Sequence, residues 1–300
     1  MMKTYHNPVL LQEAIEGLNI NPLGIYVDVT FGGGGHSRAI LNKLSSEGKL
    51  FAFDQDDSAS KNTINDNRFK LISANFSNLK EHLNLYNTNQ ISGLIADFGV
   101  SSYQLDTRER GFSTRLDGPL DMRMDKKNKL SANSIINSYG ENKLTRIFKN
   151  YGELNRAKSY AKKIVESRTH KKILTTKGLL KVLHPLIAKK NLNKEMAKIF
   201  QAIRIEVNQE LEAIKFLLPQ TVDFILKGGR LVCISYHSLE DRLVKKFIRD
   251  GNFDENLETD LYGNKYVPYK KIGRLITPSE KELIKNKRSR SAKLRIAERV

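Results

Sequence analysis

The chain has 300 residues, of which 39% are hydrophobic, and a formal net charge of +18. This length allows one large or two modest domains with an ample core. No apolar run approaches the roughly 18 residues that indicate a membrane span, and no signal-peptide core precedes Glu13. The single cysteine, Cys233, excludes an internal disulfide and a cysteine-based zinc cluster. We therefore expect a cytoplasmic protein without a membrane partner.

The positive charge is concentrated in two blocks. Residues 1–102 carry 8 basic and 10 acidic side chains, whereas residues 141–200 carry 16 and 4, and residues 265–300 carry 12 and 3. An A/T-rich genome that enriches lysine on solvated faces would explain part of this excess, but it should not spare residues 1–102. The asymmetry therefore favours a nucleic-acid partner.

The first motif is an apolar strand, Ile25–Thr30, that runs into four consecutive glycines, Gly32–Gly35. A helical pattern, His36–Leu44, follows. Glycine has no Cβ, so such a turn lets backbone N–H groups approach a bound cofactor closely. The positive end of the following helix points at the same place. The alternative is a tight turn that only packs a helix against a strand.

The second strand, Leu50–Asp54, ends in an acid. A carboxylate at this place binds ribose hydroxyls in nucleotide-binding α/β folds, which strengthens the interpretation as a nucleoside site. The glycines are contiguous, unlike the spaced glycines of the dinucleotide fingerprint, and no P-loop occurs. S-adenosylmethionine fits better, since it has one ribose, no pyrophosphate, and a sulfonium cation that suits carboxylates such as Asp28 and Asp97.

Strands and helices continue to alternate along most of the chain. The patterns predict strand Phe69–Ser73, helix Leu79–Leu85, strand Ile91–Asp97, a long helix Phe200–Leu226, strand Arg230–Tyr236, helix Ser238–Arg249, and two strands around Tyr266–Ile276 and Ala292–Val300 that could pair as a hairpin. This alternation is typical of an α/β fold with a parallel, doubly wound sheet.

Residues 105–199 break the alternation with a charged loop and helical patterns such as Ala157–Val165. We expect an all-helical insertion after the fourth strand, which divides the chain into residues 1–104, 105–199 and 200–300. Such an insertion would place basic helices beside the carboxyl ends of the strands, where α/β folds bind ligands. We interpret it as a substrate domain.

Several stretches together resemble the bacterial 16S rRNA cytosine-N4 methyltransferase family known as RsmH or MraW. The matching stretches are His6–Leu11, Asp28–Ser37, Asp97–Leu105, Glu109–Ser113, Asp117–Asp125, Tyr151–Glu153, Phe200–Ile205, Ile234–Arg242 and Arg290–Arg299. They span the chain from end to end. Phe98 and Tyr236 depart from the family pattern, which usually has Leu and Phe at these positions.

The resemblance implies a class I, Rossmann-like methyltransferase fold with an inserted all-helical domain. It also implies S-adenosylmethionine as the cofactor, and a cytosine in the decoding region of 16S rRNA, within the small ribosomal subunit, as the substrate. By the same resemblance the cofactor-binding residues are Gly34, Gly35, His36, Asp54, Phe76, Asp97 and Gln104. His36 could equally be a helix-start residue. We expect no metal, because the six histidines lack close metal-ligand spacing.

Two residues that follow strands are candidates for the methyl-transfer chemistry. Asp97 stands where an acceptor could face the cytosine amine and take its proton, although it could instead cap the next turn. His237 could hydrogen-bond the base or a phosphate. Ser238 and Asp241 have the spacing of a capping box for the next helix, which explains those two residues but not His237.

Two other classes of protein compete with the methyltransferase interpretation. A dehydrogenase would need room for a pyrophosphate, which the contiguous glycines followed by His36 disfavour. A non-catalytic RNA-binding protein would explain the basic blocks but would leave the glycine turn, Asp54 and Asp97 without a role. Equilibrium binding of S-adenosylmethionine against NAD would separate the three.

Overall fold

The structure, a computed structural model, describes residues 8–253 and 267–300. The chain forms two compact units, one made of residues 1–99 and 211–300, and the other of Val100–Glu210. We call them the sheet unit and the helical unit. His6 and Asn7, which begin the first stretch of the family resemblance, lie outside the described residues, as does Tyr266 of the predicted hairpin.

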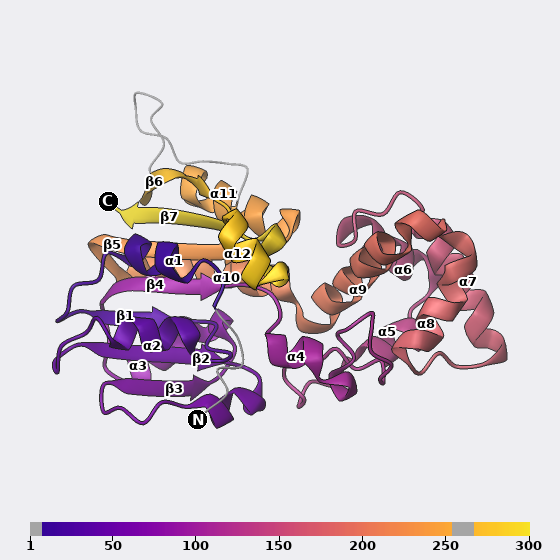
Figure 1. The fold of residues 1–300 in the computed structure, drawn as a ribbon, viewed down its shortest axis with the longest axis horizontal. Coiled ribbons are helices and arrows are strands. Elements are labelled where there is room, and N and C mark those ends of the chain that lie inside the picture. The colour runs from indigo at the N-terminus through magenta and orange to yellow at the C-terminus, as the bar shows by residue number, and fades with distance from the viewer. Residues whose placement is uncertain (1–7, 254–266) are drawn as a thin grey trace. The chain divides into compact units, whose positions relative to one another are not determined.

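The sheet unit is built on a seven-stranded sheet with the order β3-β2-β1-β4-β5-β7-β6 (Figure 1). The strands are β1 (Ile25–Asp28), β2 (Lys49–Asp54), β3 (Phe69–Ser73), β4 (Ile91–Asp97), β5 (Ile225–Ser235), β6 (Tyr269–Ile276) and β7 (Lys293–Arg299). Strands β1 to β5 pair in parallel, and β7 runs antiparallel between β5 and β6. The parallel sheet and the closing hairpin are therefore confirmed.

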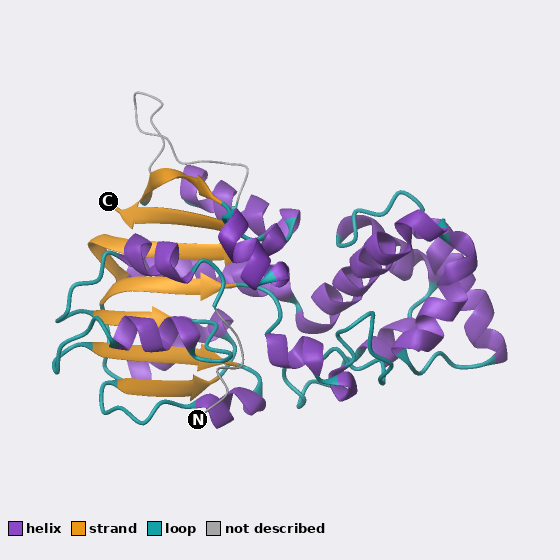
Figure 2. Cartoon of the chain, viewed as in Figure 1, coloured by secondary structure: helices purple, strands orange, loops and turns teal. Residues whose placement is uncertain are grey.

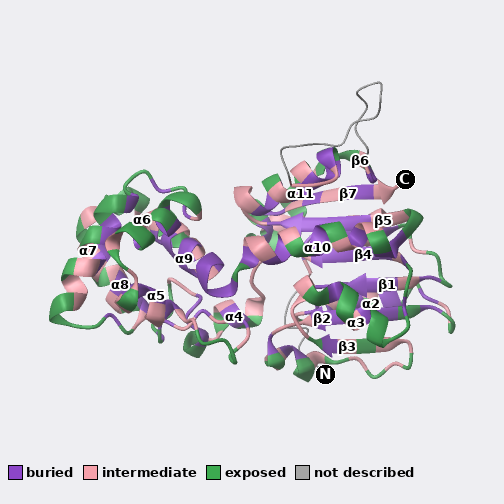
Figure 3. Cartoon of the chain, turned by 180° about the vertical axis from the view of Figure 1, so that it is seen from behind, coloured by how far each residue is buried: buried purple, intermediate pink, exposed green. Residues whose placement is uncertain are grey.

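Helices cover both faces of this sheet, as the views from the two sides show (Figures 1 and 3). Successive strand residues point to opposite faces. Tyr26 and Ile95 thus share one core with α1 (Leu11–Leu18) and α2 (Gly35–Leu41). Val27 and Leu94 share the other core with α3 (Leu79–Leu85), α10 (Glu210–Phe224) and α11 (Ser238–Asp250). A further short helix, α12 (Glu280–Lys285), precedes β7.

The helical unit has a hydrophobic core of its own, and it is drawn as helices joined by loops in Figure 2. Its helices are α4 (Ser102–Asp106), α5 (Ala132–Ser138), α6 (Glu141–Asn150), α7 (Ala157–His170), α8 (Thr176–Leu183) and α9 (Leu192–Asn208). Fully buried Leu144, Tyr160 and Ile199 bring α6, α7 and α9 together. Among its described residues the only extended pairing is an isolated bridge between Pro119 and Thr175.

The prediction of one long helix over Phe200–Leu226 is wrong. The chain breaks at Gln209, whose φ of 51° is left-handed, and β5 already begins at Ile225. Hydrogen bonds of Asn208 stabilise the end of α9 at this break. Its side chain accepts a hydrogen bond from the Met124 amide and donates one to the Met122 carbonyl. The helical unit accordingly includes α9 and runs over Val100–Glu210, whereas the predicted insertion was 105–199.

In the described part of the chain, no helix is both long enough and apolar enough to cross a membrane.

Candidate cofactor and methyl-transfer site

The carboxyl ends of β1, β2 and β4 carry one acid each, Asp28, Asp54 and Asp97. These strands are neighbours and run in parallel, so the three acids lie at one edge of the sheet. The strand order reverses between β1 and β4, and ligands of α/β folds bind at this kind of switch point. The predicted site therefore lies where the topology favours a ligand.

The glycine turn joins β1 to α2 and contains glycines of two kinds. Gly34 has a φ of +74°, and a Cβ there would lie 2.9 Å from the Phe31 ring. A Cβ at Gly35 would lie 2.1 Å from Cγ of Pro8. The fold itself therefore requires glycine at positions 34 and 35, the two glycines that the resemblance assigns to the cofactor.

Gly33 is the glycine that the fold leaves unexplained. It is exposed, its φ is not in the left-handed region, and a Cβ there would meet nothing within 4 Å among the described residues. A ligand lying against the turn would require a glycine at such a position. The sequence offered no signal that separates Gly33 from its neighbours.

Asp54 fixes this turn from the end of β2. Its Oδ2 accepts a hydrogen bond from the Gly32 amide at 2.8 Å, and its Oδ1 accepts one from the Asp56 amide at 2.8 Å. Burial raises the pKa of Asp54 to about 6, against the effect of these two hydrogen bonds. Each carboxylate oxygen can accept a second hydrogen bond, so a ribose hydroxyl can still bind there.

Asp28 is almost fully buried, and its carboxylate oxygens accept hydrogen bonds from neighbouring residues, so its proximity to the sulfonium stays a prediction. Its side chain is buried, with Oδ2 accepting from the Ser37 hydroxyl at 2.7 Å and Oδ1 from the Thr30 amide at 3.0 Å. Burial raises the pKa of Asp28. This carboxyl group ties α2 to the end of β1.

Asp97 lies at the centre of a polar cluster. Its Oδ1 accepts a hydrogen bond from the Tyr236 hydroxyl at 2.8 Å, and its Oδ2 lies 3.9 Å from Nδ1 of His36. Burial raises the pKa of Asp97 to about 6, as do the nearby acids Asp28 and Glu240, while His36 and Tyr236 act in the opposite direction. The Asp97 side chain is nevertheless 22% exposed, so a ligand can reach it.

His36 contacts Asp97 from α2. Its Nε2 lies 3.1 Å from the Val9 carbonyl oxygen, and its side chain is only 6% exposed. A ring that is buried in this way can act on a ligand through Asp97. Direct contact with the cofactor stays a prediction.

The other two predicted cofactor residues are Phe76 and Gln104. Phe76 begins a 3₁₀ turn after β3, and its ring centroid lies 6.0 Å from that of Phe98. Gln104 belongs to the helical unit, where its side chain accepts from the Ser101 amide and caps α4. Their cofactor roles stay predictions.

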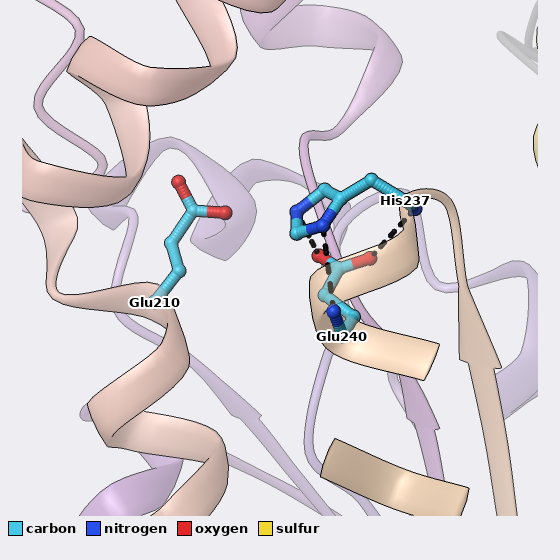
Figure 4. A group of neighbouring side chains, drawn as sticks. All are labelled: Glu210, His237 and Glu240. Carbon is cyan, nitrogen blue, oxygen red and sulfur yellow. Dashed lines mark hydrogen bonds and ion pairs between the residues drawn. The ribbon is translucent and has the colours of Figure 1, made fainter. Parts of the chain in front are cut away.

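His237 is the N-cap of α11, and the predicted capping box of Ser238 and Asp241 is wrong (Figure 4). The Glu240 amide donates to Nδ1 of His237 at 3.4 Å, and Oε2 of Glu240 accepts from the Tyr236 amide at 2.8 Å. Asp241 instead accepts from Arg295 of β7 at 2.7 Å. Glu240, which is fully buried, is a residue that the sequence reasoning missed.

The cap leaves little of the His237 ring exposed. Its side chain is 9% exposed, with Nε2 3.1 Å from Oε1 of Glu240. Contact with a base or a phosphate therefore stays a prediction. Glu210, also drawn in Figure 4, belongs to the helical unit, where its carboxylate accepts two hydrogen bonds from Arg204.

The model of the MraW methylase family matches residues 3–300. The chain belongs to this family. Three similar proteins all carry the name ribosomal RNA small subunit methyltransferase H. That of Flavobacterium johnsoniae is 53% identical over 99% of this chain and 98% of its own length. The protein of Christiangramia forsetii is 52% identical over 100% of this chain and 99% of its own length. That of Cytophaga hutchinsonii is 53% identical over 98% of this chain and 99% of its own length.

This member of the MraW methylase family is a methyltransferase with a class I, Rossmann-like fold, and its cofactor is S-adenosylmethionine. The residues at the sheet edge fit that cofactor. Asp54 has acceptor capacity left for a ribose, Gly33 leaves open space beside the turn, and the Asp97 carboxylate can be reached. When bound, the cofactor supplies the methyl group on a sulfonium.

We predict that Asp54→Ala weakens cofactor binding at least tenfold, because it removes charge-assisted hydrogen bonds of about 1.5–3 kcal/mol each. Isothermal titration calorimetry with S-adenosylmethionine measures this. Asp223→Ala, which removes an acid that is 60% exposed on α10, is the control and should bind normally. Unchanged affinity of a folded Asp54→Ala variant would contradict the ribose role.

We also predict that Asp97→Asn stabilises the ligand-free protein at pH 7. Folding raises the pKa of Asp97 from 3.8 to about 6, so the native state holds this proton more tightly than the unfolded chain does. The contribution of this carboxyl to stability is therefore present below pH 4 and is lost as the pH rises through about 6.

The variant, which cannot ionise, should gain about 1–3 kcal/mol over the parent between pH 4 and pH 7. Urea unfolding at several pH values measures the difference. Exposed Asp223→Asn should show no such pH-dependent gain. A parent as stable as Asp97→Asn at pH 7 would mean that Asp97 is not strained by its burial.

Proposed function

We propose that this enzyme methylates N4 of a cytosine in 16S rRNA, in the decoding region of the small ribosomal subunit, and that it acts in the cytoplasm. The names of the relatives support small-subunit rRNA as the substrate. The observation that carries the choice of an amine as the acceptor of the methyl group is the Asp97 carboxyl group, which combines burial, a pKa of about 6 and a reachable side chain.

Cytosine N4 is a poor nucleophile, because its lone pair is delocalised into the ring. An acceptor for one amine hydrogen favours rehybridisation, and it can take the proton that becomes acidic as N4 is methylated. A carboxyl group with a pKa of about 6 is mostly ionised at pH 7 and still binds a proton readily. In our proposal Oδ2 of Asp97 is that acceptor.

Orientation would supply the rest of the rate enhancement. The reacting nitrogen and the methyl carbon must be held about 3–3.5 Å apart and in line with the leaving sulfur. Asp54 and the glycine turn would hold the cofactor, and Asp97 would hold the amine. Both carboxylates already accept hydrogen bonds from the backbone or from a side chain, so in our proposal neither needs to reorganise when the ligands bind.

Basic side chains on each unit support RNA as the partner. Around α7 and the loop after it, Lys162, Lys171 and Lys172 are exposed. In the sheet unit a cavity of about 260 Å³ between α11 and the β6–β7 hairpin is lined by both apolar and basic side chains, among them Ile248, Lys245 and Lys271. A cavity lined by apolar and cationic side chains suits a nucleobase and its phosphates.

We predict that Asp97→Asn lowers the rate of methyl transfer by about 10²–10³, the cost of losing one preorganised electrostatic contact. Single-turnover methylation at saturating S-adenosylmethionine measures the chemical step. Asp66→Asn, which affects an ion pair with Arg68 just before the amino end of β3 and therefore away from the carboxyl ends of the strands, is the control and should react normally. A near-normal rate for Asp97→Asn at saturation would leave Asp97 as a binding residue only.

We further predict that Lys162→Gln, Lys171→Gln and Lys172→Gln together weaken RNA binding and reduce its dependence on salt concentration, because fewer counterions are then released. The matched control replaces three exposed lysines of the near-neutral segment, Lys43, Lys49 and Lys70. Both variants lose the same net charge. Equal salt slopes for the two variants would show that the lysines of the helical unit are an ordinary solvated face.

A further inference from the structure

Tyr236 is brought to Asp97 by the pairing of β4 with β5. In this parallel register Asp97 lies opposite Ile234, so Tyr236 follows two residues after the partner of Asp97. The Tyr236 hydroxyl then donates to Oδ1 of Asp97 at 2.8 Å, across 139 positions of sequence. This hydroxyl is the only side-chain hydrogen-bond donor to the Asp97 carboxylate among the contacts found in the described residues.

Two contacts fix the direction of the Tyr236 side chain. Its backbone amide donates to Oε2 of Glu240 at 2.8 Å, within the cap of α11. Its ring lies over Gly99, where a Cβ would come within 3.3 Å of Cδ2 of the ring and where φ is +103°. The hydroxyl is therefore held in place by the backbone on one side and by the close approach of a glycine on the other.

The Tyr236 hydroxyl is one of the groups around Asp97 that affect the pKa of its carboxyl group. Asp97 faces Asp28 of β1 and Glu240 of α11, both of which raise its pKa, as burial does. His36 of α2 and Tyr236 lower it. Burial, with Asp97, Glu240 and Glu282 of α12 nearby, keeps the pKa of Tyr236 well above its ordinary value of 10, so the phenol remains a donor at every working pH.

We propose that Tyr236 is a positioning residue for methyl transfer, whose hydroxyl holds the Asp97 carboxylate in its ionised form and leaves Oδ2 to accept from the substrate amine. This inference rests on the proposed function of Asp97. With Oδ1 engaged by Tyr236, the remaining oxygen is the one that lies 3.9 Å from His36 Nδ1. A donor to the charged form lowers the pKa of a carboxyl group, so Tyr236 widens the pH range in which Asp97 can act as an acceptor.

Tyr236→Phe removes the hydroxyl and keeps the ring. Tyr269→Phe is the matched control, because it also removes a phenol from a buried position in the sheet unit, where Tyr269 donates to Thr221 at 2.8 Å. Two quantities are measured for the parent and both variants. One is the titration of the Asp97 carboxyl carbon by NMR with ¹³C-labelled aspartate, assigned with Asp97→Asn. The other is the single-turnover rate against pH at saturating S-adenosylmethionine.

For Tyr236→Phe we expect both midpoints to rise by roughly 0.5–1 pH unit, which is the net effect of one hydrogen bond. The rate should then fall by about 3- to 10-fold on the acidic side of the midpoint and recover at higher pH. Tyr269→Phe should reproduce both parent curves.

The two measurements separate the possible failures. If neither midpoint moves in Tyr236→Phe, the role of Tyr236 is overturned, and the function proposed for Asp97 is untouched. If the carboxyl titration moves but the pH profile of the rate does not, Asp97 is not the acceptor, and the role of Tyr236 in methyl transfer fails with it.

Discussion

The site depends on carboxyl groups that the parallel sheet buries wholly or in large part at one edge. Burial disfavours their charge, and it is the first cause of the raised pKa values of Asp28, Asp54 and Asp97. Each carboxylate is stabilised by a hydrogen bond from a specific donor, which is Ser37 for Asp28, Gly32 for Asp54 and Tyr236 for Asp97. The strand order β2-β1-β4-β5 brings those donors to the carboxylates, so the topology of the sheet determines the electrostatic surroundings of the three acids.

This arrangement sets stability against function. A buried carboxylate surrounded by other acids destabilises the ligand-free protein, and a neutral side chain at the same place would remove that cost. A cation and a polarised amine that arrive with the ligands would relieve it. In our proposal, the free energy that the buried Asp97 carboxylate costs the protein alone is recovered as affinity and reactivity when the ligands bind.

Much of this could be predicted from sequence because the signals are local. The run Ile25–Asp28 and the glycines that follow it predict a strand and a turn, and Asp54 and Asp97 each stand at the end of an apolar run. The break at Gln209 could not be predicted, because the apolar period of α9 continues into α10 and the chain turns at one residue. Gly33 is one of four consecutive glycines in the sequence, and only the structure distinguishes it from them by its backbone conformation and by the open space beside it.

Two further features were missed for physical reasons. Histidine is not among the preferred N-cap residues, so Ser238 was the natural choice, whereas the backbone places His237 at the cap and Glu240 at the third helical position. The contact of Tyr236 with Asp97 depends on the register of two strands that lie far apart in the chain, which no local pattern encodes. The glycine turn and the strand-end acids were thus predictable, and the donors that tune the acids were not.

The central claim is that Asp97 accepts a hydrogen bond from the amine that is methylated, while Asp54 binds the ribose of the cofactor. A crystal structure with S-adenosylhomocysteine and a short RNA that contains the target cytosine tests it most directly. We expect the exocyclic N4 to lie within hydrogen-bond distance of Oδ2 of Asp97, with the ribose hydroxyls hydrogen-bonded to Asp54. An amine bound by another residue, with Asp97 turned to the cofactor instead, would contradict it.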